Sequence, residues 1–151
     1  MIAKKITDKE EIKKCILFAF KGDNKFFQSY KVNINEKTSL KDTVNKVNEA
    51  IKNCGAEFHT IICEDKIIGY FCIIPKMFCL FSFGINIHHR TDENKVKFFD
   101  TLNTFFKEKI MVGLYSKNIR AIRFFETNGF KVVNETVDKE GRKQTMLIKN
   151  L

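Results

Sequence analysis

Residues 114–130, with the sequence LYSKNIRAIRFFETNGF, place polar side chains at the start of a short amphipathic helix. Its apolar face is formed by residues at helical spacing, with Phe124 beside them: Ala121, Ile122 and Phe125. Ser116 or Asn118 can cap the first turn, and Gly129 can take the left-handed conformation that ends the helix. A helix start offers free N–H groups and partial positive charge, so this region favours a ligand that carries hydrogen-bond acceptors.

The cysteines do not have the pattern of a disulfide framework, a zinc site or a nucleophile. Their number is odd, no C-x-x-C pair occurs, no histidine is adjacent, and four of the five lie in apolar surroundings: Cys15, Cys54, Cys63, Cys72 and Cys79. We therefore predict buried, reduced thiols that serve packing, and no metal site.

The formal net charge of +9 raises the question of nucleic acid binding. Only four of the 27 basic residues are arginines, and the lysines are spread along the chain. Arginine is the usual reader of bases and phosphates, whereas scattered lysine is typical of a solvated surface. A nucleic-acid-binding module is therefore the least favoured of the three functions weighed below.

The apolar segments predict one domain over residues 1–151 and no membrane contact. The longest apolar run, residues 67–74, is far shorter than the roughly 20 residues of a spanning helix. The N-terminal sequence mixes both charge signs and lacks the apolar region of a secretory signal, so we expect a cytoplasmic protein. The 16 phenylalanines leave room for an exposed apolar patch and a homodimer.

Hydrophobic periodicity predicts an α+β domain in the order β-α-α-β-β-β-α-β-α-β-β. Strands are expected at residues 2–6, in a hairpin over 58–74 that turns at 64–66, and at 77–88, 110–115, 131–137 and 143–148. Helices are expected at residues 8–20, 39–53 and 94–109, followed by the helix of the opening stretch. The helix over 94–109 should bury Val96, Phe99, Leu102 and Phe106, and residues 21–37 should form a loop.

The opening stretch resembles the C-terminal signature N-x-x-A-x-x-x-Y-x-x-x-G-F of the GNAT superfamily, the acyl-CoA-dependent N-acyltransferases. Asn118, Ala121, Gly129 and Phe130 match that signature, and the element order agrees with the family's fold. The resemblance implies a mixed, mostly antiparallel sheet with helices on both faces and splayed fourth and fifth strands. In that family the pantetheine arm of acetyl-CoA lies in the gap and pairs with the backbone of the fourth strand.

The resemblance also implies which residues bind acetyl-CoA. Residues 81–89 would be the fourth strand and residues 109–115 the fifth. Asn118 would contact the arm, Ala121 would leave room for it, and a backbone N–H near Ile87 would polarise the thioester carbonyl. Ser116 and Phe125 belong to the same cofactor-binding set.

The loop that would bind the pyrophosphate departs from the family pattern. The family reads R-x-x-G-x-G or R-x-x-G-x-A, whereas this chain has HHRTDENKVKFF, without a glycine in either possible register. Side chains would then have to replace backbone N–H groups, and the candidates are Arg90, Lys95 and Lys97. Loops of this kind resemble those of some phage-encoded GNAT-like proteins.

The catalytic groups depart as well, because Phe125 stands where the family has a tyrosine that protonates the leaving thiolate. Tyr115 is the nearest phenol in the sequence and the candidate substitute acid. An amine acceptor must also lose a proton, and His88, near the end of the expected fourth strand, is the candidate base. Strand alternation points only one of the adjacent His88 and His89 into the cleft. Alternatives are His59, Glu57 and Glu64, the last two acting through water.

The sequence therefore favours a GNAT-type N-acyltransferase that transfers an acetyl or similar group from acetyl-CoA or a related acyl-CoA to the primary amine of a small molecule or peptide. The alternative is a GNAT-fold protein that has lost catalysis and serves in binding or structure. The glycine-poor loop and Phe125 support this alternative.

Overall fold

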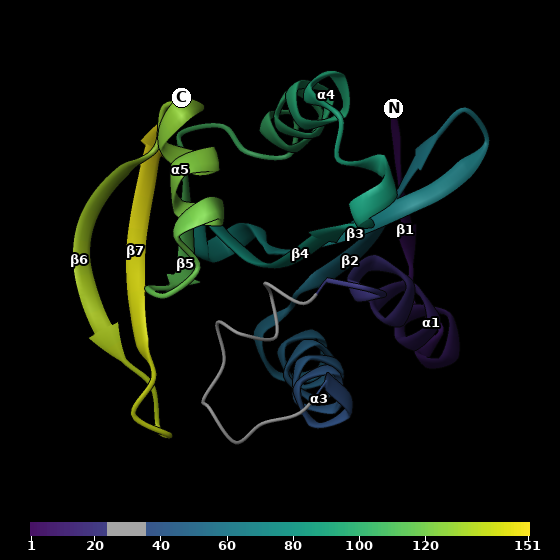
Figure 1. Cartoon of the computed structure of the whole chain (residues 1–151), viewed down its shortest axis with the longest axis horizontal. Helices are drawn as coiled ribbons and strands as arrows, with labels where there is room; N and C mark the ends of the chain where they lie inside the picture. The colour runs from purple at the N-terminus through teal and green to yellow at the C-terminus, as the bar shows by residue number, and fades with distance from the viewer. Residues whose placement is uncertain (24–35) are drawn as a thin grey trace.

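The computed structural model describes residues 1–23 and 36–151, and these ranges form one sheet covered by helices on both faces (Figure 1). The strands are β1 (Ile2–Ile6), β2 (Glu57–Cys63), β3 (Lys66–Ile74), β4 (Cys79–Ile85), β5 (Lys109–Tyr115), β6 (Lys131–Val137) and β7 (Lys143–Asn150). The helices are α1 (Lys9–Phe20), α3 (Glu36–Cys54), α4 (Asp92–Asn103) and α5 (Ile119–Thr127). Two short 3-10 helices, η1 (Pro75–Met77) and η2 (Ile87–His89), flank β4.

The sheet is mostly antiparallel, in the strand order β1-β2-β3-β4-β5-β7-β6. Within residues 1–23 and 36–151 it has one parallel pair, β4–β5, near the middle of the order. Helices α1 and α3 pack on one face, and α4 and α5 pack on the other (Figure 1). This confirms the predicted α+β fold, its element order and its mixed sheet. No helix in the described ranges is both long and apolar enough to cross a membrane.

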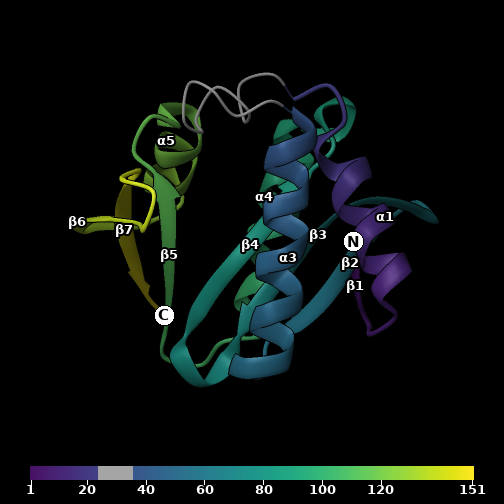
Figure 2. The ribbon, with the colours of Figure 1, turned by 90° about the horizontal axis from the view of Figure 1, so that it is seen from below.

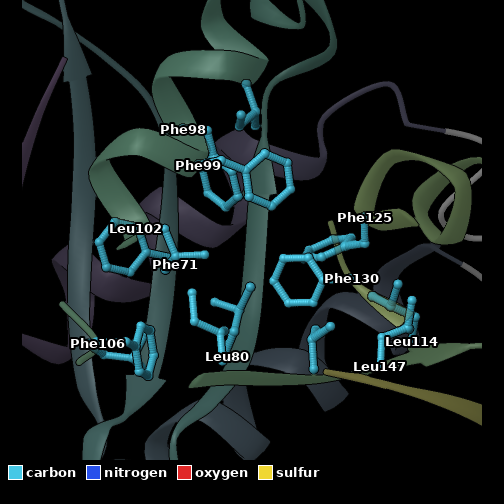
Figure 3. Close-up of a cluster of buried hydrophobic side chains, with 14 of the residues drawn as sticks. Phe71, Leu80, Phe98, Phe99, Leu102, Phe106, Leu114, Phe125, Phe130 and Leu147 are labelled. Atoms are coloured by element: carbon cyan, nitrogen blue, oxygen red, sulfur yellow. The ribbon is translucent and has the colours of Figure 1, made fainter. Parts of the chain in front are cut away.

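The face under α4 and α5 holds a core rich in phenylalanine. Rings from β3, α4, α5 and the residue just before β6 meet there with leucines from β4, β5 and β7 (Figure 3). The labelled members include Phe71, Phe98, Phe99, Phe125 and Phe130. The opposite face is sealed by residues of α1, α3, β2 and β3. Burying both faces of the central strands fixes their register, because a one-residue slip would move every apolar side chain to the wrong face.

Local signals set several boundaries as predicted. Asp8 caps α1, where its carboxylate accepts a hydrogen bond from the Glu11 N–H at 3.0 Å. The β2–β3 turn places Glu64 and Asp65 at positive φ, as a tight hairpin requires. Gly129 takes φ +92° at the end of α5, a conformation that favours glycine.

The predicted limits of three elements are wrong, and local turns and caps explain those of β4 and the start of α4. The extended stretch predicted for residues 77–88 is the shorter strand β4, because Pro75 opens η1 before it and Asn86 caps η2 after it. The helix predicted for residues 94–109 begins at Asp92, behind the Thr91 cap, and ends at Asn103. Val96 is 56% exposed, contrary to the prediction, while Phe98 is buried instead. The second helix spans residues 36–54 rather than 39–53, and most of the predicted loop over 21–37 lies outside the described residues.

Candidate functional site

Strands β4 and β5 pair over only two positions and then separate. Cys79 lies opposite Met111 and Leu80 opposite Val112, and no later pair is formed between the two strands. Beyond these pairs, β4 continues along β3 to Ile85 and β5 continues along β7 to Tyr115. Figure 2 shows the two strands as the arms of a V. The facing edges of residues 81–85 and 113–115 therefore have no neighbouring strand in the described chain, and we call this break in the strand pairing the slot.

Asn86 ends β4 and fixes the turn that follows. Its N–H donates to the carbonyl of Ile68 at 2.8 Å, and its side-chain amide donates to the carbonyl of Phe18 at 2.8 Å. Its side-chain oxygen accepts from the N–H of His88 at 3.0 Å. Since Asn86 is itself buried, these bonds hold the end of β4 to both β3 and α1.

The backbone N–H of Ile87 follows this turn and has no hydrogen-bond acceptor among the described residues. The next two N–H groups do have one, because those of His88 and His89 bond to the side chain and the carbonyl of Asn86. The imidazole of His88 belongs to an exposed residue, whereas His89 is half-buried. At the end of β4 the structure thus presents the Ile87 N–H, without an acceptor among the described residues, and the exposed His88.

On the other side of the slot, Asn118 begins α5. Its side-chain oxygen accepts from the N–H of Ala121 at 3.3 Å, so the predicted cap is confirmed. The small side chain of Ala121 packs against the phenylalanine-rich core. Ser116 instead directs its hydroxyl to Thr145 at 2.8 Å, on β7, which lies on the side of β5 away from the slot.

Tyr115 and Phe125 lie on opposite faces of the sheet. Leu114 belongs to the core under α4 and α5, so alternation turns Tyr115 to the face of α1 and α3. There the guanidinium of Arg142 lies 5.2 Å from the centre of the Tyr115 ring. The ring of Phe125 is fully buried on the α4 and α5 face. Tyr115 therefore does not occupy the place that a tyrosine at position 125 would have.

The three predicted basic residues point in different directions. Arg90 donates from Nε to the carbonyl of Ile85 at 2.6 Å and pairs with Asp23. Lys95 lies 5.8 Å from the centre of the Phe124 ring, on the side of α4 that faces α5. Lys97 pairs with Glu93 at 2.7 Å, and this partner raises the pKa of Lys97.

The start of α4 has little capacity for an anion. Thr91 caps it, with the hydroxyl accepting from the N–H of Asn94 at 3.1 Å. Asp92 and Glu93 occupy the first turn, where their negative charge already complements the partial positive charge of the helix end. Where the family has glycines, this chain thus has a helix start whose cap and acidic residues come from the chain itself.

His59 is enclosed in the core and lies two strands from β4. Its ring stacks on Phe71 at 5.1 Å and contacts Phe105 at 4.6 Å between centres. Nε2 lies 3.4 Å from a carboxylate oxygen of Glu57 but lacks hydrogen-bond geometry, and burial lowers the His59 pKa. His59 is therefore buried away from β4 and β5, and its neighbour Glu57 pairs with Lys5 as well.

The prediction of buried thiols holds for Cys15 and Cys72, whereas Cys63 and Cys79 are half-buried and Cys54, contrary to the prediction, is exposed. All five cysteines are free, and burial raises the pKa of Cys15 and Cys72 to about 12 and that of Cys79 to about 11. Such thiols are protonated near neutral pH and are therefore poor nucleophiles. Among the described residues, no cluster of three or more histidine, cysteine or acidic side chains is placed to hold a metal ion.

Two residues at the slot were missed by sequence reasoning. Asp23, just beyond α1, is buried and forms ion pairs with Arg90 and Arg120. Asn86 organises the end of β4. Neither follows a motif, and the contacts of Asp23 with Arg90 and Arg120 span 67 and 97 positions of the sequence. Both residues are polar and buried, and burial of this kind is visible only in the folded chain.

Solved structures share this whole architecture, although no family model and no curated protein sequence matches the chain. A GCN5-related N-acetyltransferase from Rhodopseudomonas palustris aligns with a TM-score of 0.72 at 10% identity, covering 99% of this chain and 95% of that one. A chimera of the spermidine N-acetyltransferase SpeG from Vibrio cholerae with hSSAT aligns at 0.64 and 12% identity, covering 99% and 96%. Ribosomal-protein-alanine N-acetyltransferase from Brucella melitensis aligns at 0.61 and 14% identity over 100% of both chains.

These alignments, together with the β4–β5 separation, show that the chain has the GNAT fold. At identities of 10 to 14% they establish the fold alone. The resemblance noted in the sequence is thereby confirmed at the level of architecture.

Proposed function

We propose that this protein is an N-acyltransferase that transfers an acetyl or similar acyl group from acyl-CoA to a primary amine. The observation that carries the proposal is the end of β4–β5 pairing after two positions, in a fold shared with N-acetyltransferases. An arm with amide groups, such as pantetheine, can hydrogen-bond to a free strand edge as a peptide does. The slot offers such an edge on each side.

The residues present fit the two ends of acyl-CoA unequally. At the thioester end, the free N–H of Ile87 and the small Ala121 suit a carbonyl oxygen and a slender arm. At the diphosphate end, the capped and acidic start of α4 offers no backbone cradle, so binding there depends on side chains. We therefore expect acyl-CoA affinity to come mainly from the arm.

When bound, acyl-CoA supplies an acyl group activated as a thioester. The N–H of Ile87 would donate to the thioester carbonyl and stabilise the negative charge that develops on its oxygen during attack by the amine. His88, exposed beside that N–H, would accept the amine proton, directly or through water. No phenol stands at position 125, but a thiol of pKa about 8.5 leaves tolerably as thiolate near neutral pH. Tyr115 lies on the opposite face from Phe125, so it would donate a proton to the thiolate only through intervening water.

Thermal unfolding with added acetyl-CoA tests the binding step. A ligand held only by the native state stabilises it by RT ln(1 + [L]/Kd), or about 2.7 kcal/mol at 100 times Kd. We expect acetyl-CoA to raise the unfolding temperature in a concentration-dependent manner, and adenosine alone to have a smaller effect. No rise at millimolar acetyl-CoA would refute the proposal.

Substitutions of Asn118 separate its role in capping from its role in binding. Asn118→Ser keeps an oxygen that can accept from the Ala121 N–H, so the helix cap should survive. It removes the amide that would contact the arm, so acetyl-CoA should bind more weakly with little change in the stability of the free protein. Asn118→Ala should lower both. Unchanged affinity in Asn118→Ser would leave Asn118 a structural cap only.

A thiol-release assay tests turnover. The aligned structures include a spermidine N-acetyltransferase and a ribosomal-protein-alanine N-acetyltransferase, so spermidine and a peptide with an N-terminal alanine are suitable acceptors for the first panel. We expect release of free CoA that depends on both acetyl-CoA and an amine. His88→Ala should lower the rate near and above neutral pH, and should change it least at low pH, because a protonated imidazole no longer accepts a proton.

A GNAT-fold binding protein without catalysis is the second candidate, and two observations favour it. Phe125 is buried in the core rather than presented to the slot, and the start of α4 lacks an anion cradle. Binding of acetyl-CoA without thiol release for any amine would select this candidate.

A further inference from the structure

Three charged side chains from distant parts of the sequence meet at the open end of the slot. Asp23 follows α1, Arg90 follows β4 and η2, and Arg120 lies in the first turn of α5. One carboxylate oxygen of Asp23 pairs with Arg90 Nη2, and the other lies 3.5 Å from Arg120 Nη2. The carboxylate is almost completely buried, while Arg120 is half exposed. We call these three residues the arginine clamp.

The two guanidinium groups come from opposite sides of the slot. Arg90 is anchored by its Nε bond to the carbonyl of Ile85, the last residue of β4. Arg120 stands two positions after Asn118, the cap that follows β5. Because β4 and β5 are parallel and diverge toward their carboxyl ends, both arginines lie where the strands are farthest apart. A single carboxylate thus joins the two sides.

Asp23 is held in this position by its own turn. Its N–H donates to the carbonyl of Phe20 at 3.0 Å, and the preceding Gly22 takes φ +76°. A side chain at Gly22 would meet the Ile87 side chain at 3.2 Å, so this turn packs directly on η2. The backbone that carries Asp23 is therefore fixed against η2, the turn that precedes Arg90.

The charges of the clamp are unequal. Two guanidinium groups carry two positive charges, and one carboxylate offsets one of them. Guanidinium groups bind phosphate and carboxylate oxygens with the same forked geometry, so a phosphate can replace a carboxylate at the same donors. A diphosphate, with at least two negative charges and more acceptor oxygens, would satisfy both arginines more fully than Asp23 does.

We propose that Arg90 and Arg120 form a side-chain clamp for the diphosphate of acyl-CoA and that Asp23 occupies this clamp until the diphosphate displaces it. The identity of the ligand rests on the proposed function; the competition between carboxylate and diphosphate does not. The clamp would replace the glycine-rich backbone cradle that the chain lacks at residues 93 and 95. Asp23 would also keep two like charges from facing each other when no ligand is bound.

The first test uses inorganic pyrophosphate as the probe and calorimetry as the readout. Asp23→Asn keeps the shape of the side chain and removes its charge, so pyrophosphate should bind on the order of tenfold more tightly, equivalent to about 1.4 kcal/mol. Arg90→Gln and Arg120→Gln should each weaken binding by a similar factor. Asp42→Asn is the matched control, because Asp42 pairs with Arg142 at 3.8 Å in a separate cluster, and it should leave the affinity unchanged.

Equal or weaker binding of pyrophosphate by Asp23→Asn would overturn the inference, because Asp23 would then orient the arginines rather than compete for them. If Asp23→Asn does not fold, Arg120→Gln decides, since its half-exposed side chain can be replaced at little cost to folding. Unchanged pyrophosphate affinity in Arg120→Gln would also overturn the clamp.

Acetyl-CoA separates this inference from the proposed function. Tighter pyrophosphate binding by Asp23→Asn without any stabilisation by acetyl-CoA would support the clamp and refute the acyltransferase. Stabilisation by acetyl-CoA that is the same in the parent, Asp23→Asn and Arg120→Gln would support the acyltransferase and refute the clamp.

Discussion

Phe125 is the position where the chain departs most clearly from the GNAT signature, and its ring is part of the core. It contacts the rings of Phe83, Phe99 and Phe130 with centres 5.1, 5.3 and 4.9 Å apart. A hydroxyl on a ring so enclosed would need a buried partner, and a phenyl ring does not. A phenylalanine at the position where the family signature has a tyrosine therefore suits this apolar, phenylalanine-rich core.

Phe125→Ala should lower the free energy of unfolding by about 3 to 5 kcal/mol, because it removes a fully buried ring and leaves a cavity. Phe124→Ala is the matched control on the same helix; its ring is only half-buried, so the loss should be clearly smaller. Urea denaturation of both variants measures the difference. Equal losses of unfolding free energy in the two variants would contradict the tight packing of Phe125.

His59 should make stability depend on pH. Burial lowers its folded pKa below the ordinary value of 6.5, Lys5 acts in the same direction, and Glu57 opposes both. The unfolded chain then binds the proton more readily, so the stability from neutral His59 is complete above pH 6.5 and is lost as pH falls toward the folded pKa. The slope for one proton is at most about 1.4 kcal/mol per pH unit. Denaturation midpoints from pH 7.5 to pH 5 should fall less steeply in His59→Phe than in the parent.

Local residue signals could be predicted and remote ones could not. The cap at Asn118 and the left-handed Gly129 follow from neighbours within a few positions, and both were predicted correctly. Asp23 acquires its role from Arg90 and Arg120, which only the folded chain brings to it. The predicted contribution of Arg90 remains a proposal, now with a competing carboxylate beside it.

At the scale of elements, the separation of β4 and β5 was predicted from the family resemblance, and the pairing explains it. β5 pairs with β7 along its whole length, and β4 pairs with β3. Each of the two strands is therefore held in the sheet without pairing to the other. The limits of β4 and α4 were wrong because Asn86 and Thr91 bind nearby backbone N–H groups and start new turns. Periodicity alone does not contain these competing bonds.

Gly69 allows the close approach of β3 and β4 that supports one side of the slot. A Cβ atom at this position would lie 2.1 Å from the carbonyl oxygen of Gly84, which is backbone and has little freedom to move. Gly69→Ala should therefore cost at least about 2 kcal/mol of stability, as overpacking of a rigid core does. Gly84→Ala is the matched control, since its Cβ would meet side-chain atoms of Phe20 at 3.0 Å and these can shift. Thermal unfolding should rank Gly69→Ala below Gly84→Ala, and the reverse order would refute the backbone clash.

Most phenylalanines of the described residues lie in or against the core of the whole domain. Among the described phenylalanines, only Phe18 and Phe81 are exposed, each with 37% of its surface accessible. The exposed valines of the edge strand β6 are a stronger reason to propose a homodimer than phenylalanine content: Val132, Val133 and Val137. The sequence could supply the composition of the core but not which strand would form the edge.

The net charge of +9 is also a property of the whole surface, and the structure argues against a focused nucleic-acid site around α4 and α5. The basic residues there have separate surroundings: Arg120 shares Asp23, Lys97 pairs with Glu93, and Lys95 lies over Phe124. We predict that neutralising four of them lowers the salt needed to elute the protein from a polyanion column no more than neutralising four exposed lysines elsewhere. The first set is Lys95, Lys97, Arg120 and Arg123, and the second is Lys13, Lys14, Lys52 and Lys139.

The two sets remove the same formal charge, so attraction by net charge alone predicts equal shifts in elution. A true binding surface concentrates its phosphate contacts, and each lost contact lowers the dependence of affinity on salt by about one unit of slope. A markedly larger shift for the first set, together with a shallower salt dependence for a DNA duplex, would therefore establish the nucleic-acid function. Equal shifts would mean that the basic residues attract a polyanion only through their total charge. The specific partners of Arg90, Arg120 and Lys97 would then be the carboxylates within the protein.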